Sequence, residues 1–201
     1  SAMVGDGNGN FGWGSNELQF LEDGDPHRRI ALGDITGDGL IDCVLTSVTE
    51  SGLGLFEAKP GTPVPDWKLP KLVYAPACND AVIADLDDDG RPDLVATAKD
   101  LDSVVVFMTT HAGTVGKPRL YPAGDAPGAL VVADFDLDGV PDVMAANPTQ
   151  GTVQVFRGTG TGGFGPARAL RVGQAPNDIA TADFDNDGDL DAAIACADHL
   201  T

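Results

Sequence analysis

The sequence predicts an all-β fold, a β-propeller built from short antiparallel sheets. An acidic nine-residue loop recurs four times, at spacings of 51, 49 and 49 residues. Apolar runs of strand length flank every copy of the loop. The composition, with 26 Gly, 14 Pro and only 6% aromatic residues, indicates many turns around an aliphatic core. Four short strands in a repeat of forty to fifty residues are typical of propeller blades.

The repeated loop is nearly the same in every copy. It reads DITGDGLID at residues 34–42, DLDDDGRPD at 85–93, DFDLDGVPD at 134–142 and DFDNDGDLD at 183–191. Its constancy in length and spacing indicates one structural unit that is used repeatedly.

Each unit is expected to contain four strands, and the first two of them flank the acidic loop. We expect first strands at 30–32, 81–84, 130–133 and 179–182, second strands at 43–46, 94–97, 143–146 and 192–196, third strands at 52–58, 103–110 and 152–159, and fourth strands at 71–76, 118–123 and 167–172. The predicted domain is a single propeller over 1–201, with blade 1 at 26–75, blade 2 at 76–123, blade 3 at 124–173, the inner strands of blade 4 at 174–201 and outer-strand material of a closing blade at 1–25.

The two ends of the chain carry complementary parts of a blade. GDGNGNFG at 5–12 aligns with GTGTGGFG at 158–165, which separates a third strand from a fourth. ELQFL at 17–21 then reads as an outer strand without a unit of its own. Pairing of this N-terminal strand with the last blade would close a ring of four blades and remove exposed sheet edges. The alternative is that the four repeats belong to a larger propeller.

The acidity of the chain is concentrated in the repeated loops. The formal net charge is -19, and 17 of the 31 acidic residues lie in the four loops, so the rest of the chain is close to neutral. Such a balance predicts no nucleic-acid partner. No apolar run reaches the roughly 20 residues that span a bilayer, so we predict no membrane insertion. No signal-type segment begins the sequence.

Carboxylates at loop positions 1, 3, 5 and 9, with Gly at position 6, can direct several oxygens at one cation. Calcium prefers six to eight oxygen ligands in a tolerant geometry, and a position 7 carbonyl can add one. An EF-hand is excluded because position 12 is never Glu. Thr36 and Gly37 interrupt the first loop, so among up to four calcium sites we expect it to bind most weakly. The predicted ligands are Asp34, Thr36, Asp38, Leu40, Asp42, Asp85, Asp87, Asp89, Arg91, Asp93, Asp134, Asp136, Asp138, Val140, Asp142, Asp183, Asp185, Asp187, Asp189 and Asp191.

The three cysteines, Cys43, Cys78 and Cys196, cannot all pair with one another, and their spacing matches no zinc pattern. We expect them to act as small apolar residues in the core.

The acidic loops, the GTGTGGFG turn and the fifty-residue period resemble the FG-GAP or VCBS repeats of integrin α-chain-like β-propellers. The resemblance covers nearly the whole chain. It implies that Asp34, Asp85, Asp134, Asp183 and their loop partners bind calcium in the hairpin between the first two strands of each blade. Propellers of this family usually have seven blades, so the number of repeats here leaves the size of the ring open.

The resemblance also implies a second face, opposite the acidic loops, where polar side chains could bind a glycan or a peptide. Ordinary solvated loops are the alternative for these residues. Trp13 and Trp67 could stack on sugars or pack against a blade edge. The polar candidates are His27, Arg28, Arg29, Asn79, Asp80, Lys99, Asp100, Asp102, Asn147, Thr149, Gln150, Asn177 and Asp178.

The sequence gives little support to catalysis. The three histidines lie in different units, without a nucleophile motif or a phosphate-binding loop near them. We therefore predict a secreted or cell-surface adhesion or ligand-binding module with a glycan or protein partner, and not an enzyme. A calcium-stabilised structural spacer and a domain of a secreted carbohydrate-active enzyme are the alternatives. A homodimer that completes a larger ring is a further possibility.

Overall fold

The computed structural model describes residues 3–5, 11–13, 29–47, 53–61, 71–73, 75–110 and 114–197, and these residues form an all-β chain. The described strands make five antiparallel sheets. One is the N-terminal hairpin of β1 (Met3–Gly5) and β2 (Phe11–Trp13). The described part has a single helical turn, the 3-10 helix η1 (Lys99–Leu101).

The other four sheets are the blades. Blade 1 has β3 (Ile30–Gly33), β4 (Asp42–Thr46), β5 (Leu53–Phe56) and β6 (Lys71–Val73). Blade 2 has β7 (Asp80–Ala84), β8 (Asp93–Ala98), β9 (Ser103–Phe107) and β10 (Arg119–Pro122). Blade 3 has β11 (Leu130–Ala133), β12 (Asp142–Asn147), β13 (Thr152–Phe156) and β14 (Arg168–Arg171), and blade 4 has β15 (Pro176–Ala182) and β16 (Asp191–Cys196). Strands are paired in sequence order within each blade. The all-β fold is confirmed, and each strand predicted for the four units overlaps a strand of the structure.

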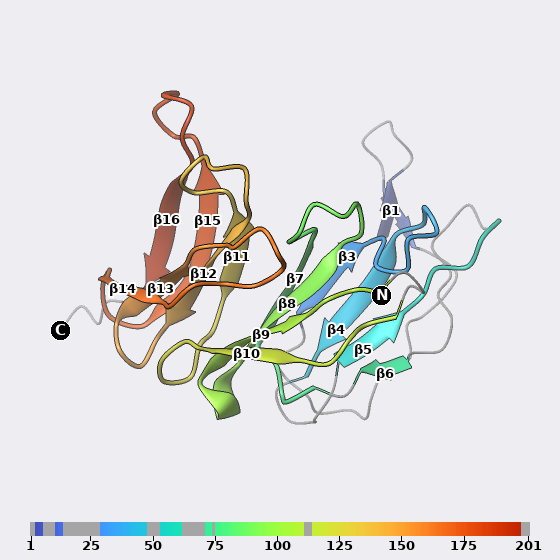
Figure 1. Ribbon diagram of the computed structural model, residues 1–201, viewed down its shortest axis with the longest axis horizontal. Helices are drawn as coiled ribbons and strands as arrows, with labels where there is room; N and C mark the ends of the chain where they lie inside the picture. The colour runs from blue at the N-terminus through green and yellow to red at the C-terminus, as the bar shows by residue number, and fades with distance from the viewer. Residues whose placement is uncertain are drawn as a thin grey trace.

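The blades follow one another from right to left in Figure 1. Their first strands are neighbours, because β3 contacts β7, β7 contacts β11 and β11 contacts β15. All four acidic loops, which join the first strand of a blade to the second, lie along the upper side of this view, and η1 lies at the lower side.

The hydrophobic core lies between successive blades. Successive side chains of a strand point to opposite faces of its sheet, so a central blade buries both faces. All six residues of β8 are buried. One apolar cluster joins blades 1 and 2 through Val44 and Val105, a second joins blades 2 and 3 through Val95 and Val143, and a third packs Ile179 against blade 3.

Blade 4 is covered on one face. The burial of β16 alternates between exposed and half-buried, whereas the equivalent strand β12 is almost fully buried. Among the described strands, β15 and β16 pair only with each other, and so do β1 and β2. The pairing of the N-terminal strand with the last blade is therefore not among the described strand pairs, and the predicted outer strand at 17–21 lies outside the described residues. The predicted blade boundaries stay a prediction.

The cysteines lie within the described sheets and connections. None of the three forms a disulfide. Cys43 and Cys78 are buried, as predicted, and burial raises the pKa of the Cys43 thiol to about 11 and that of the Cys78 thiol to about 12. Cys196 is only half-buried. In the described residues no helix is long and apolar enough to cross a membrane.

Candidate metal centres and a pocket on the opposite face

The first Asp of each loop organises the loop backbone. The two carboxylate oxygens of Asp85 accept hydrogen bonds from the Asp89 and Gly90 amides at 3.3 and 2.8 Å. Asp34, Asp134 and Asp183 accept the equivalent pairs of bonds. Asp89 in turn accepts the amide of Arg91 at 2.9 Å. Positions 1 and 5 therefore hold the loop backbone in place through hydrogen bonds within the loop itself.

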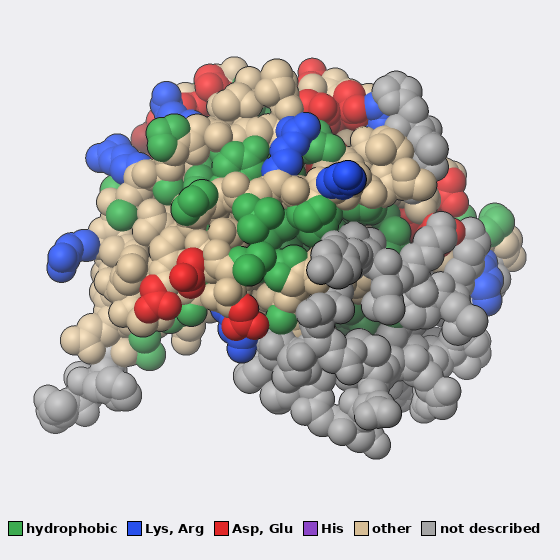
Figure 2. Space-filling view, turned by 60° about the horizontal axis from the view of Figure 1, so that its bottom comes forward, with side chains coloured by type: hydrophobic (Ala, Val, Ile, Leu, Met, Phe, Trp, Pro, Cys, Tyr) green, Lys and Arg blue, Asp and Glu red, His purple; other side chains and the backbone are tan. Residues whose placement is uncertain are grey.

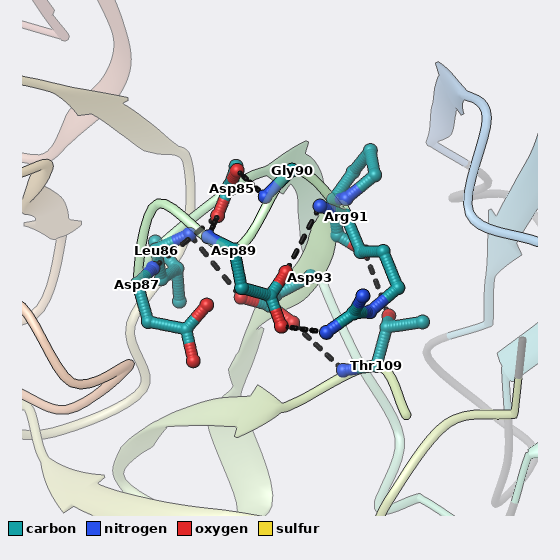
Figure 3. A network of polar contacts seen from close by, with 9 residues as sticks. Asp85, Leu86, Asp87, Asp89, Gly90, Arg91, Asp93 and Thr109 are labelled. Carbon is teal, nitrogen blue, oxygen red and sulfur yellow. Dashed lines mark hydrogen bonds and ion pairs between the residues drawn. The ribbon is translucent and has the colours of Figure 1, made fainter. Parts of the chain in front are cut away.

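The last Asp of the loop connects it to the rest of the blade. Asp93 accepts the Leu86 amide at 3.2 Å and the Thr109 amide, which follows the third strand, at 2.7 Å (Figure 3). Asp142 makes the same two contacts, with Phe135 and Gly158. Because one partner lies in the loop and the other follows the third strand, the position 9 carboxylate clamps the loop against the third strand.

Two positions of the loop need a left-handed backbone. Position 6 is Gly in all four copies, with φ between 81° and 97°. Position 4 is also left-handed, with φ of 73° at Gly37, 56° at Asp88, 58° at Leu137 and 61° at Asn186. From the sequence, Gly37 counts as an interruption of the first loop. In the structure it takes the left-handed conformation of position 4, which Gly adopts without strain.

Three of the loops bring carboxylates together closely enough to hold a metal ion. In each cluster, one oxygen from the acids at positions 1, 3 and 9 lies within 4.8 Å of the other two. Two oxygens on opposite sides of a calcium ion would be about 4.6 to 5.2 Å apart, so this spacing suits one ion. The clusters are Asp85, Asp87 and Asp93, then Asp134, Asp136 and Asp142, then Asp183, Asp185 and Asp191.

The side chain at position 3 has an unsatisfied oxygen in the first three loops. Thr36 Oγ1, Asp87 Oδ1 and Asp136 Oδ1 are buried and have no hydrogen-bond partner in the described part of the chain. Buried polar atoms are nearly always partnered, because an unpaired one costs about 1–3 kcal/mol. These orphaned oxygens all occupy the position predicted to contact an ion, so the residues present fit a bound cation.

The carboxylates within each cluster repel one another. Burial raises the pKa of Asp93 and of Asp142, and neighbouring carboxylates of the same loop add to the effect, although the backbone amides that each residue accepts lower it. Arg91 forms an ion pair with Asp89, and the mostly exposed Arg157 forms one with Asp136. A metal ion would relieve the remaining repulsion directly.

The three clusters contain acids from positions 1, 3 and 9. The roles of the position 5 acids and of the position 7 carbonyls as ligands stay predictions. The first loop has Thr36 in place of the acid at position 3, and it forms no cluster of three acids in the described residues.

On the opposite face, several predicted partner-binding side chains are used within the protein. Asn79 donates to the Pro127 carbonyl at 2.8 Å, and Asp80 accepts the Leu130 amide at 3.2 Å. Asn147 is fully buried and donates to the Ala123 carbonyl at 3.1 Å. Asp102 accepts the Ala126 amide at 3.0 Å. These side chains join one blade to the next segment, so they are structural.

The remaining candidates include two that line a pocket. An open pocket of about 710 Å³ lies between blades 3 and 4, lined by residues 148–151, 171–175 and Ala197. Thr149 and Gln150 are among the candidates predicted from the sequence. Arg171, the last residue of β14, and Gln174, in the connection that follows β14, are not among them. Figure 2 brings this lower side of the molecule forward and shows hydrophobic side chains gathered at its middle. His27, Arg28 and Trp67 lie outside the described residues.

No curated protein matches the sequence. Among solved structures, an Agrocybe aegerita lectin that specifically recognises non-reducing terminal N-acetylglucosamine aligns with a TM-score of 0.59 and 22% identity, over 83% of this chain. The Photorhabdus luminescens Tc holotoxin pore aligns with a TM-score of 0.50 and 20% identity, over 86% of this chain. The chain spans 46% of the lectin chain and 8% of the toxin chain, so both are similar to it in fold only.

The repeats themselves match a family model. The model for the FG-GAP-like repeat matches residues 85–145 and again residues 134–194, in the same phase as the acidic loops of blades 2, 3 and 4. Together the two matches cover more than half of the chain. The protein belongs to the FG-GAP-like repeat family.

Proposed function

We propose that this chain is a secreted or cell-surface, calcium-stabilised β-propeller that binds a glycan in the pocket between blades 3 and 4. The observation that carries the proposal is that the acidic loops and the pocket lie on opposite sides of the molecule. The acidic side chains hold the loops on one side, while the described lining of the pocket on the other side combines glycine and apolar residues with uncharged and basic polar side chains.

Calcium is the cation that the loops fit best. All side-chain donors in the clusters are oxygens, and no Cys or His that would favour zinc or copper is among them. Magnesium demands near-octahedral geometry and gives up its waters reluctantly, whereas calcium accepts irregular oxygen sets. Millimolar extracellular calcium would fill even weak sites, which supports secretion or surface display.

A glycan suits the chemistry of the pocket. Thr149, Gln150, Arg171 and Gln174 together offer hydroxyl, amide and guanidinium groups, which donate to and accept from sugar hydroxyls. Among the described residues the lining has no Asp or Glu, so this part of the pocket does not offer the carboxylate pair of a glycosidase. The lectin of similar fold supports glycan recognition as the class of activity.

The test is a titration with glycans that end in N-acetylglucosamine, backed by a glycan array, in millimolar calcium. We expect Arg171→Ala to weaken binding about tenfold or more, because a charged hydrogen bond contributes about 1.5–3 kcal/mol. Arg168→Ala is the matched control, since Arg168 is exposed on the same strand but does not line the pocket.

Two outcomes would count against the proposal. Equal losses in the two variants would place binding outside the pocket. No glycan binding by the unaltered protein would favour the structural spacer or a protein ligand.

A further inference from the structure

The outer edge of blade 4 has no neighbour among the described strands. In blades 1 to 3 the second strand is paired on both sides, as β12 is with β11 and β13. β16 pairs only with β15 in the described residues. A free strand edge exposes a row of backbone donors and acceptors that can pair with another strand.

The last carboxylate of the fourth loop lacks the clamp found in the other blades. Asp42, Asp93 and Asp142 each accept an amide from a residue sixteen positions later, at 2.7 to 2.8 Å. Asp191 accepts the Phe184 amide at 3.0 Å, but no third-strand amide reaches it in the described part. The acid cluster of the fourth loop is therefore less firmly held than the clusters of the second and third loops.

The N-terminal hairpin has the same backbone pattern as the turn that follows the third strand in blades 2 and 3. The donors Thr109 and Gly158 each form a bridge with the residue six positions later, Val115 and Phe164. In the hairpin, Gly5 pairs with Phe11, which is also six positions later. The GDGNGNFG and GTGTGGFG segments align over the same residues. Gly5 therefore corresponds to the residue whose amide clamps the last Asp of a loop.

The two ends of the row of blades also leave complementary faces open. Leu130 and Val132 of β11 pack into the cluster of blade 2. The equivalent residues of β3, Ile30 and Leu32, are 60% and 59% exposed. At the other end Phe184 is 59% exposed, whereas its equivalent in blade 2, Leu86, is 2% exposed between blades 2 and 3.

These open features lie at opposite ends of the chain. Figure 1 shows β1 beside blade 1 on the right and β16 at the far left. We propose that a second copy of this chain completes blade 4. The hairpin of the second copy joins the edge of β16, its Gly5 amide donates to Asp191, and its Ile30 and Leu32 pack against Phe184.

The junction repeats the blade-to-blade interface that already exists three times within the chain. It is head-to-tail, so two such junctions close a ring of two copies, and a mismatch in angle would instead give an open chain. It also brings a backbone donor of the second copy to Asp191, in the acid cluster of the fourth loop. The proposal goes beyond glycan binding and does not depend on it.

The first test is the mass in solution with calcium, measured by light scattering over a range of concentrations. We expect an assembly of two copies that dissociates on dilution. Ile30→Asp and Gly5→Pro should each give a monomer, because one places a charge in the junction and the other removes the amide donor. Leu120→Asp is the control, since Leu120 is 49% exposed on the outer strand of blade 2.

A mixing experiment identifies the head-to-tail geometry. The Ile30→Asp variant has an altered blade 1 face and an intact blade 4. The Phe184→Ser variant has an altered blade 4 and an intact blade 1 face. Each variant alone should be monomeric, while a mixture should form a heterodimer with one intact junction. A monomeric unaltered protein at high concentration would overturn the proposal. So would a mixture that forms no heterodimer, or an assembly lost equally in Leu120→Asp.

Discussion

At the scale of single residues, the fourth position of each loop matters because its backbone is left-handed. Asn and Asp tolerate this conformation, since their short side chains bond locally, whereas a branched apolar residue is strained by about 1–2 kcal/mol. Leu137 holds this position in blade 3 with φ of 58°, and Asn186 holds it in blade 4 with φ of 61°. Exchanging the residue types at these two positions therefore tests how much the left-handed backbone strains Leu137.

We expect Leu137→Asn to raise the free energy of unfolding by about 1 kcal/mol, because it relieves strain. Leu137 is 58% exposed, so little burial is lost. Asn186→Leu should lower stability by a similar amount. Urea unfolding of both variants checks the pair, and a shift of both in the same direction would contradict the explanation.

At the scale of the element, the position 9 carboxylate makes the loop and the third strand a single unit. Asp142 is 2% exposed and accepts amides from Phe135 and Gly158, on either side of β12. Asp138 lies in the same loop and is exposed, and in the described part of the chain it accepts the amide of Val140 alone. The two acids therefore carry the same charge but different structural roles.

We expect Asp142→Ala to destabilise the protein by about 2 kcal/mol or more even in chelator, because it leaves two amides without their partner. Asp138→Ala should cost less than about 1 kcal/mol under the same conditions. Thermal unfolding without metal measures both. Equal costs would mean that the clamp has no structural role apart from the ion.

At the scale of the whole molecule, stability comes from stacked sheets whose loops concentrate negative charge on one side. The apolar clusters between blades favour the stack, while repulsion within each loop opposes it. A cation that binds only the folded state stabilises it by about 2.7 kcal/mol per site at a hundred times its Kd.

Removing calcium should therefore lower Tm clearly, and adding it back should restore Tm. Magnesium at the same concentration is the control and should restore less, because the loops fit its geometry poorly. Differential scanning calorimetry measures the shifts. An unchanged Tm in chelator would contradict calcium binding by the folded protein.

The strands and loops could be predicted from the sequence because their signals are local. Apolar runs around a fixed Asp and Gly pattern located the strands of all four blades to within a few residues. The clamp was not predictable, since the donor to Asp93 is Thr109, and any amide in that segment could serve. The left-handed position 4 was missed because Leu137 gives no sign of it.

The sequence by itself determined the repeat, the four-stranded blades and the acids that meet in three loops, because all of these depend on residues within one unit. Only the tertiary structure decided which polar side chains are free to bind a partner. Asn79 and Asn147 bond backbone groups of distant segments, whereas Arg171 and Gln174 face a pocket between two blades. The physical reason is that buried backbone groups take the partners that packing brings near, and packing joins residues far apart in the chain.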